Sequence, residues 1–163
     1  MSSKHSVALR RIGCLCILGI CSASAYGWAP SDPCALLTQA EVSAILGTNV
    51  EVAQRIAPTL CQWSAPNQPN SMNGKKVTIT VSNETAFGYA KTPITKSVKT
   101  IPASGIGDDA VYAIMGGVTP GLGTSLYVKK ANSYFVVHVY GFPDQSKAMA
   151  MEKALAIQAC LRL

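Results

Sequence analysis

The sequence predicts an α+β fold in which a mainly antiparallel sheet is flanked by an N-terminal helix and a C-terminal helix. Three observations predict it: a capped helix near the start, a series of segments in which apolar residues alternate with polar ones, and a terminal stretch rich in Ala, Met, Leu, Glu and Lys. Runs of strands bounded by helices are typical of this class, whereas strict strand–helix alternation builds parallel sheets. We therefore expect helix, strands, a short helix, more strands and a final helix.

The opening helix is expected within "DPCALLTQAEVSAILG", which begins at residue 32. Asp32 before Pro33 is the pattern of an N-cap followed by proline at the first helical position, and predicts a short turn. Thr38 and Glu41 form a T-x-x-E capping box for a longer helix, and Gly47 supplies its C-terminal stop. The cysteine of this stretch therefore lies at the entrance of a helix.

The middle of the chain reads as strands because its apolar residues recur with a period of two. "SYFVVHVYGF" is apolar on both faces, as expected for a central strand, and "KKVTITVSN" has one apolar face. A short helix is expected near "ETAFGYAK", and the glycines of "GGVTPGLG" predict a hairpin connection. The expected strands are "VEVAQ", "LCQWSA", "KKVTITVSN", "DAVYAIM", "TSLYVKK" and "SYFVVHVYGF".

The final helix is expected from a cap at Asp144 or Ser146 through Leu161, because its composition favours helix. Projected at 100° per residue, it has a mostly apolar half and a polar half, and we expect Glu152 in the outer, polar half. The residues expected to face inward are Met149, Ala150, Ala154, Ala156, Ile157, Cys160 and Leu161.

The first 25 residues have the features of a secretory signal peptide. Basic residues precede the apolar run "IGCLCILGIC", and "SASA" then supplies small residues for cleavage after Ala25. The apolar run is much shorter than the ~20 residues that span a bilayer. We expect residues 1–25 to be removed and residues 26–163 to form a single exported α+β domain, secreted or periplasmic.

A lipid anchor is the alternative fate of this leader, because bacterial lipoproteins are cut just before a cysteine. That cysteine follows a small residue, whereas Cys21 and Cys16 follow Ile and Leu. Cys14 follows glycine but lies too close to the basic residues to have an apolar run ahead of it. A lipid anchor at Cys21 is therefore disfavoured.

The charge of the chain is lowered by removal of the leader. Three of the 14 Lys and Arg residues lie in it, which leaves 11 against 8 Asp and Glu, a formal charge of +3 rather than +6. The remaining basic residues form no long run, so we expect no nucleic-acid binding. An attraction to anionic surfaces stays open.

Three cysteines remain beyond the leader, and they permit one disulfide among three pairings. We favour Cys34 with Cys61, because Cys61 lies in a strand that must pack beside the first helix; the pairings with Cys160 stay open. Such a loop would stabilise the fold by about 3–4 kcal/mol. A reactive thiolate needs a nearby base or positive charge, and the sequence has no C-x-x-C motif. We therefore expect a structural bridge.

The other residues with chemical potential are expected to be structural. His138 lies in an apolar strand without the companions that a metal site needs. Asp108 and Asp109 read as a turn, since no alternating acidic pattern follows them for calcium. "GGVTPGLG" lacks the Gly-Lys-Ser/Thr end of a phosphate loop. We expect no catalytic residue, no cofactor and no metal.

Tyrosines are the residues most suited to recognition, because each combines apolar area with a hydroxyl group. Four of them fall in expected strands: Tyr112, Tyr127, Tyr134 and Tyr140. Any binding site is therefore expected on the tyrosine-bearing sheet face or on the "GGVTPGLG" hairpin.

Several of these motifs together resemble a known family. "DPCALLTQAEVSAILG", then "CQW" at 61–63, then "GIGDDA" and a strand pair before a final helix are similar to an uncharacterised domain of bacterial exported lipoproteins, best populated in actinobacteria. The resemblance implies an α+β sandwich akin to the PsbP/Mog1-like fold, with the first helix fastened to the sheet by a Cys34–Cys61 bridge. The family offers no catalytic residues to carry over.

The expected function is that of a non-catalytic exported domain, of the envelope or secreted, that binds an unidentified ligand or protein partner. A structural accessory subunit of a cell-envelope complex is the first alternative, and an enzyme is the second. An enzyme would need a convergent polar pocket with perturbed acids or bases, and the sequence offers no candidate set.

Overall fold

A computed structural model of the protein describes most of the chain from residue 32 onward. The described residues are 32–68, 74–92, 95, 97–116 and 123–163. The expected signal peptide, Cys21 and most of the "GGVTPGLG" connection lie outside them. Within these ranges no helix is long and apolar enough to cross a membrane.

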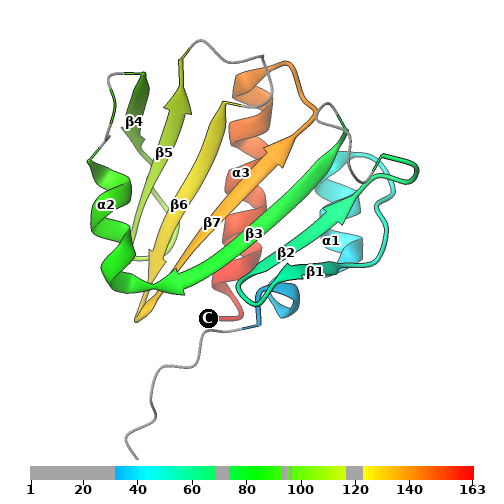
Figure 1. Cartoon of the computed structure of the whole chain (residues 1–163), viewed down its shortest axis with the longest axis horizontal. Coiled ribbons are helices and arrows are strands. Elements are labelled where there is room, and N and C mark those ends of the chain that lie inside the picture. Colours follow the sequence, from blue (N-terminus) through cyan, green and yellow to red (C-terminus); the bar gives the residue numbers. More distant parts are fainter. Residues whose placement is uncertain (1–31, 69–73, 93–94, 96, 117–122) are drawn as a thin grey trace, which may run out of the picture.

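The described residues form an α+β fold built on one seven-stranded sheet, which is antiparallel at every pairing (Figure 1). The strand order is β1-β2-β3-β7-β6-β5-β4, so β7 is central, as the sequence predicts. The strands are β1 (Gln54–Ala57), β2 (Leu60–Ser64), β3 (Lys76–Asn83), β4 (Val98–Pro102), β5 (Asp109–Met115), β6 (Thr124–Lys130) and β7 (Ser133–Tyr140). The helices are η1 (Pro33–Ala35), α1 (Gln39–Leu46), η2 (Glu84–Ala86), α2 (Phe87–Lys91) and α3 (Gln145–Cys160).

The two faces of the sheet are covered unequally. Helices α1 and α3 lie behind the sheet in Figure 1, while the short α2 lies on the other face beside β5 and β6. Alternate residues of β3 and β7 follow this division: Val77, Ile79 and Val81 are buried on the helix side, and their neighbours are half-buried on the other. Most of the core is therefore enclosed between the sheet and the α1/α3 layer.

The capping signals at the N-terminal end form as the sequence predicts. Oδ1 of Asp32 accepts the Cys34 N–H at 2.9 Å, and Pro33 opens η1. Thr38 and Glu41 make both hydrogen bonds of a capping box for α1. Gly47 ends that helix in the left-handed conformation, with φ of 65°, which glycine adopts without steric cost.

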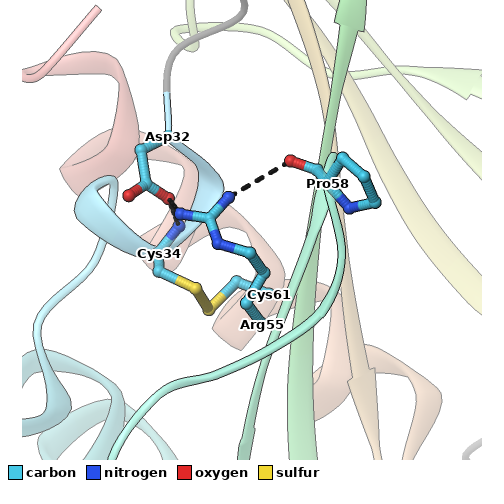
Figure 2. The surroundings of a disulfide bond; sticks show 5 residues. All are labelled: Asp32, Cys34, Arg55, Pro58 and Cys61. Carbon is cyan, nitrogen blue, oxygen red and sulfur yellow. Dashed lines mark hydrogen bonds and ion pairs between the residues drawn. A yellow bond between two sulfur atoms is a disulfide. The ribbon is translucent and has the colours of Figure 1, made fainter.

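A disulfide between Cys34 and Cys61 fastens this segment to β2, and the Cα atoms of the pair are 5.2 Å apart. Figure 2 shows Arg55 beside the bridge, between the carboxylate of Asp32 and the carbonyl oxygen of Pro58, which accepts from its guanidinium at 3.2 Å. The expected pairing is confirmed. Cys160 carries a free thiol that is half-buried.

A second connection joins the two ends of the described fold. Arg162 follows α3 and donates to the Leu36 carbonyl oxygen at 3.0 Å, while its other terminal nitrogen lies 2.7 Å from a carboxylate oxygen of Glu41. The hydrogen bond from Arg162 is the largest cause that lowers the pKa of Glu41. The end of α3 is thereby tied to both η1 and α1.

The inward face of α3 differs from the predicted one. Ala150 is exposed, and Ile157 and Leu161 are 38% and 76% exposed, although all three were expected inside. Glu152, expected outside, is completely buried. The prediction was wrong because the helix is rich in Ala and Met all round, so that its sequence defines no clear apolar stripe. The buried residues are Ala148, Met151, Glu152, Leu155, Ala156 and Ala159.

Two edge strands also differ from expectation. β1 begins only at Gln54, the last residue of "VEVAQ", because Val50 is buried beside α1 instead of continuing the sheet. The other edge strand, β4, was not predicted. It is short, and Lys99 and Pro102 interrupt its apolar residues, as is common at sheet edges.

Replacing both Cys34 and Cys61 by serine should lower the free energy of unfolding by ~2–5 kcal/mol, since the bridge closes a loop between separate elements. Denaturant titration of oxidised protein, followed by circular dichroism, measures the loss. Cys160→Ser is the matched control and should cost clearly less, because that thiol is free. Equal losses for the two changes would contradict the assigned role of the bridge.

Candidate functional site

The sheet face opposite α3 carries a continuous set of half-buried side chains, most of them polar or aromatic, that we call the open patch. Its members come from β2, β3, β6 and β7, and the strand registers place them side by side. They are half-buried rather than covered, because α2 lies against the β5–β6 part of this face. The open patch consists of Gln62, Thr78, Thr80, Ser125, Val136, His138 and Tyr140.

A stacked pair of rings stands at the centre of the open patch. The imidazole of His138 lies parallel to the ring of Tyr140, with centroids 3.9 Å apart and planes inclined by 8°. Nδ1 of His138 lies 3.1 Å from the Ser125 hydroxyl oxygen, and a side-chain hydrogen bond joins Tyr140 to Thr78. These contacts hold both rings in place.

His138 is held in its neutral form. Burial, together with the nearby Lys76 ammonium, lowers the pKa of the imidazole to about 4 from 6.5. Its Nε2 is buried and has no hydrogen-bond partner among the described residues. The neutral ring packs against Tyr140. General-base chemistry, in contrast, needs a pKa near the working pH.

The tyrosines expected to form one recognition face are divided between the two faces. Tyr127 and Tyr134 stack on the α2 side, where Phe87 packs at 5.8 Å from Tyr134. Tyr140 lies on the same face, in the open patch. Tyr112 points to the helix side and donates its hydroxyl to the Met149 carbonyl oxygen at 2.9 Å. Only Tyr140 of the four therefore belongs to the open patch.

The neighbouring carboxylates Asp108 and Asp109 have different partners. Asp108 accepts the backbone N–H of Ala131 at 2.6 Å, the largest cause that lowers the pKa of its carboxyl group. Asp109 begins β5 and pairs with Lys91 of α2. The side chain of Asp108 thus contacts the turn after β6, and that of Asp109 contacts α2. The described residues hold no cluster of His, Cys, Asp and Glu suited to a metal.

Sequence reasoning missed one unusual group, the carboxyl of Glu152. One of its oxygens accepts from the Thr124 hydroxyl at 3.1 Å and from the Val139 N–H at 3.3 Å. The recorded β6–β7 pairing reaches only Leu126 and Val137, so the N–H of Val139 finds an acceptor in this side chain instead. The other oxygen, Oε2, is buried without a partner among the described residues. Burial raises the pKa of Glu152 to about 8 from 4.5.

A perturbed carboxyl is often a catalytic signal, but a catalytic group must reach its substrate, and Glu152 has no exposed surface. A hollow of about 390 Å³ lies elsewhere, at the turns after β3 and β6, and is lined by Asn83, Glu84, Thr85 and Asn132. Its polar groups are engaged locally: Thr85 donates to Asn83, and Glu84 pairs with Lys129 at 3.0 Å. Among the residues that line this hollow, only Glu84 has an acidic side chain, and it is paired with Lys129.

Glu152 should make the protein less stable as the pH rises. Its pKa is higher in the folded state, so its contribution is fully present below pH 4.5 and is lost as the pH rises to about 8. Unfolding titrations from pH 5 to 9 should show this fall for the wild type and a flatter profile for Glu152→Gln. Thr124→Val, which removes one hydrogen bond but keeps the carboxyl, is the control and should retain the fall. An unchanged slope in Glu152→Gln would contradict the assignment.

His138 should have the opposite effect at lower pH. Its pKa is lower in the folded state, so unfolding binds a proton between pH 6.5 and about 4, and stability falls as the pH drops through that range. NMR titration of the imidazole of the folded protein should give a midpoint near pH 4. A midpoint near 6.5 would show that the ring is hydrated and not held as described.

No family model, no curated protein and no solved structure matches the chain. The likeness to an exported lipoprotein domain therefore stays a prediction from sequence motifs.

Proposed function

We propose that the chain is a non-catalytic exported domain, secreted or held in the cell envelope, that binds a ligand or protein partner through the open patch. The observation that carries the proposal is the patch itself. Aromatic and polar side chains on a helix-free part of the sheet are held in place by contacts among themselves, as in the His138–Tyr140 stack. Binding groups that are already ordered lose little conformational freedom when a partner arrives.

Export is supported by the chemistry of the fold and the form of the leader. Disulfides such as Cys34–Cys61 persist in oxidising compartments and are rare in the cytosol. The described residues contain no membrane-spanning helix. A binding role is supported over a catalytic one because Glu152 has no exposed surface and the pKa of His138 lies well below neutral pH.

Native mass spectrometry of the protein purified from its own envelope or medium tests this proposal. We expect a bound component with the wild type and its loss with Thr80→Arg, which places a long charged side chain in the open patch. Ala150→Arg on the exposed side of α3 is the matched control and should keep the component. Circular dichroism checks that both variants fold.

Two results would contradict the proposal. One is the absence of any bound component in the wild type. The other is a component that is retained by Thr80→Arg and lost by Ala150→Arg, which would move the interface to the helix side of the sheet.

A further inference from the structure

Ion pairs neutralise half of the Lys and Arg side chains of the described residues, and most of the others gather in one region. Five ion pairs join basic residues to carboxylates: Arg55–Asp32, Lys91–Asp109, Lys129–Glu84, Lys130–Asp108 and Arg162–Glu41. Five further described lysines form none of these pairs, and three of them, Lys75, Lys76 and Lys147, gather where β3 begins and where β7 ends before α3.

These lysines surround two aromatic rings, and the five side chains together form what we call the lysine corner. The ammonium group of Lys76 lies 4.7 Å from the centroid of the Tyr140 ring. Those of Lys75 and Lys147 lie 5.4 and 5.7 Å from the centroid of Phe142. Such cation–π contacts hold flexible lysine side chains in place without neutralising their charge.

The backbone of the corner is closely packed. Gly141 has φ of 81°, and a Cβ atom there would lie 2.8 Å from the backbone of Gly74. The turn at Gly141 directs Phe142 into the core on the helix side, although strict alternation would place it on the face of Tyr140. Residues of two separate segments, Lys75 and Phe142, are thereby brought together.

We propose that the lysine corner binds an acidic segment of a partner protein, which continues from the corner onto the open patch. This inference rests on the proposed function and names the chemistry of its partner. Three ammonium groups from two separate segments complement several carboxylates. The one described acidic group nearby in sequence, Asp144, accepts the Lys147 N–H as the cap of α3. Tyr140 belongs to both surfaces and connects them.

An acidic protein segment fits this corner better than an anionic membrane does. Proteins that bind a membrane surface usually insert apolar side chains in addition to basic ones. Phe142 is only 5% exposed, and the exposed large apolar side chains of the described residues all lie elsewhere. They are Val52, Ile56, Tyr89, Met115, Ile157 and Leu161.

Fluorescence anisotropy with a labelled peptide of glutamate and glycine tests the inference. We expect the wild type to bind it, to ignore the matching peptide of glutamine and glycine, and to lose affinity as salt rises from ~0.05 to ~0.5 M, where screening is strong. K75Q/K76Q/K147Q should raise Kd about tenfold or more, because it removes the complementary charge.

The triple variant K99Q/K129Q/K130Q is the control, since it loses the same net charge away from the corner and should raise Kd about twofold or less. Equal losses in both triple variants would overturn the inference, because net charge alone would then explain binding. Corner-dependent binding to phosphatidylglycerol vesicles but not to the peptide would also overturn it. If the wild type does not bind the glutamate peptide while Thr80→Arg still abolishes binding of the native component, the inference is wrong and the proposed function stands.

Discussion

The one-sided burial of the sheet is the constraint on which the other features depend. Helix α3 packs on β6 and β7, whereas β2 and β3 are covered on that side by η1 and by α1, which packs against α3. Short helices contribute little stability of their own, so this half of the layer needs connections to the rest. The Cys34–Cys61 bridge ties η1 to β2, and Arg162 ties η1 and α1 to the end of α3. With α1 and α3 fastened on one face, the part of the opposite face over β2, β3 and β7 that α2 does not cover is left mostly to polar and aromatic side chains.

Much of this fold could be predicted because its strongest signals are local. The bounds of β5 and β6 coincide with "DAVYAIM" and "TSLYVKK", and the capping box of α1 needs only Thr38 and Glu41. The sequence could not show which side of α3 packs on the sheet, because small and flexible apolar residues lie on several sides of this helix. Glu152 is an example. Its side chain points inward because it accepts a hydrogen bond from the N–H of Val139, and this N–H is left without a partner on β6 by the way the strands pair.

The candidate site was less accessible to sequence reasoning. Period-two alternation places His138 and Tyr140 on one face, and the structure confirms that they share it. Alternation cannot reveal that Ser125 of β6 faces His138 of β7, or that Lys76 lies over Tyr140, since both depend on strand order and register. The lysine corner is hidden for the same reason. Lys75 and Lys147 are far apart in the sequence and meet only through the close approach of Gly74 and Gly141.

The central strand also controls the charge of the binding face. Val139 and His138 are adjacent on β7, so Glu152 is held behind the strand and the imidazole is held in front of it. Burial keeps the carboxyl protonated up to about pH 8 and the imidazole unprotonated down to about pH 4. Between those limits both groups are uncharged, and neither adds to the field at the open patch. The lysines beside Tyr140 and Phe142 form none of the ion pairs of the described residues, so their positive charge acts at that end of the face. A sheet face that is polar but uncharged at its centre and positive at one end thus follows directly from the one-sided burial of the sheet.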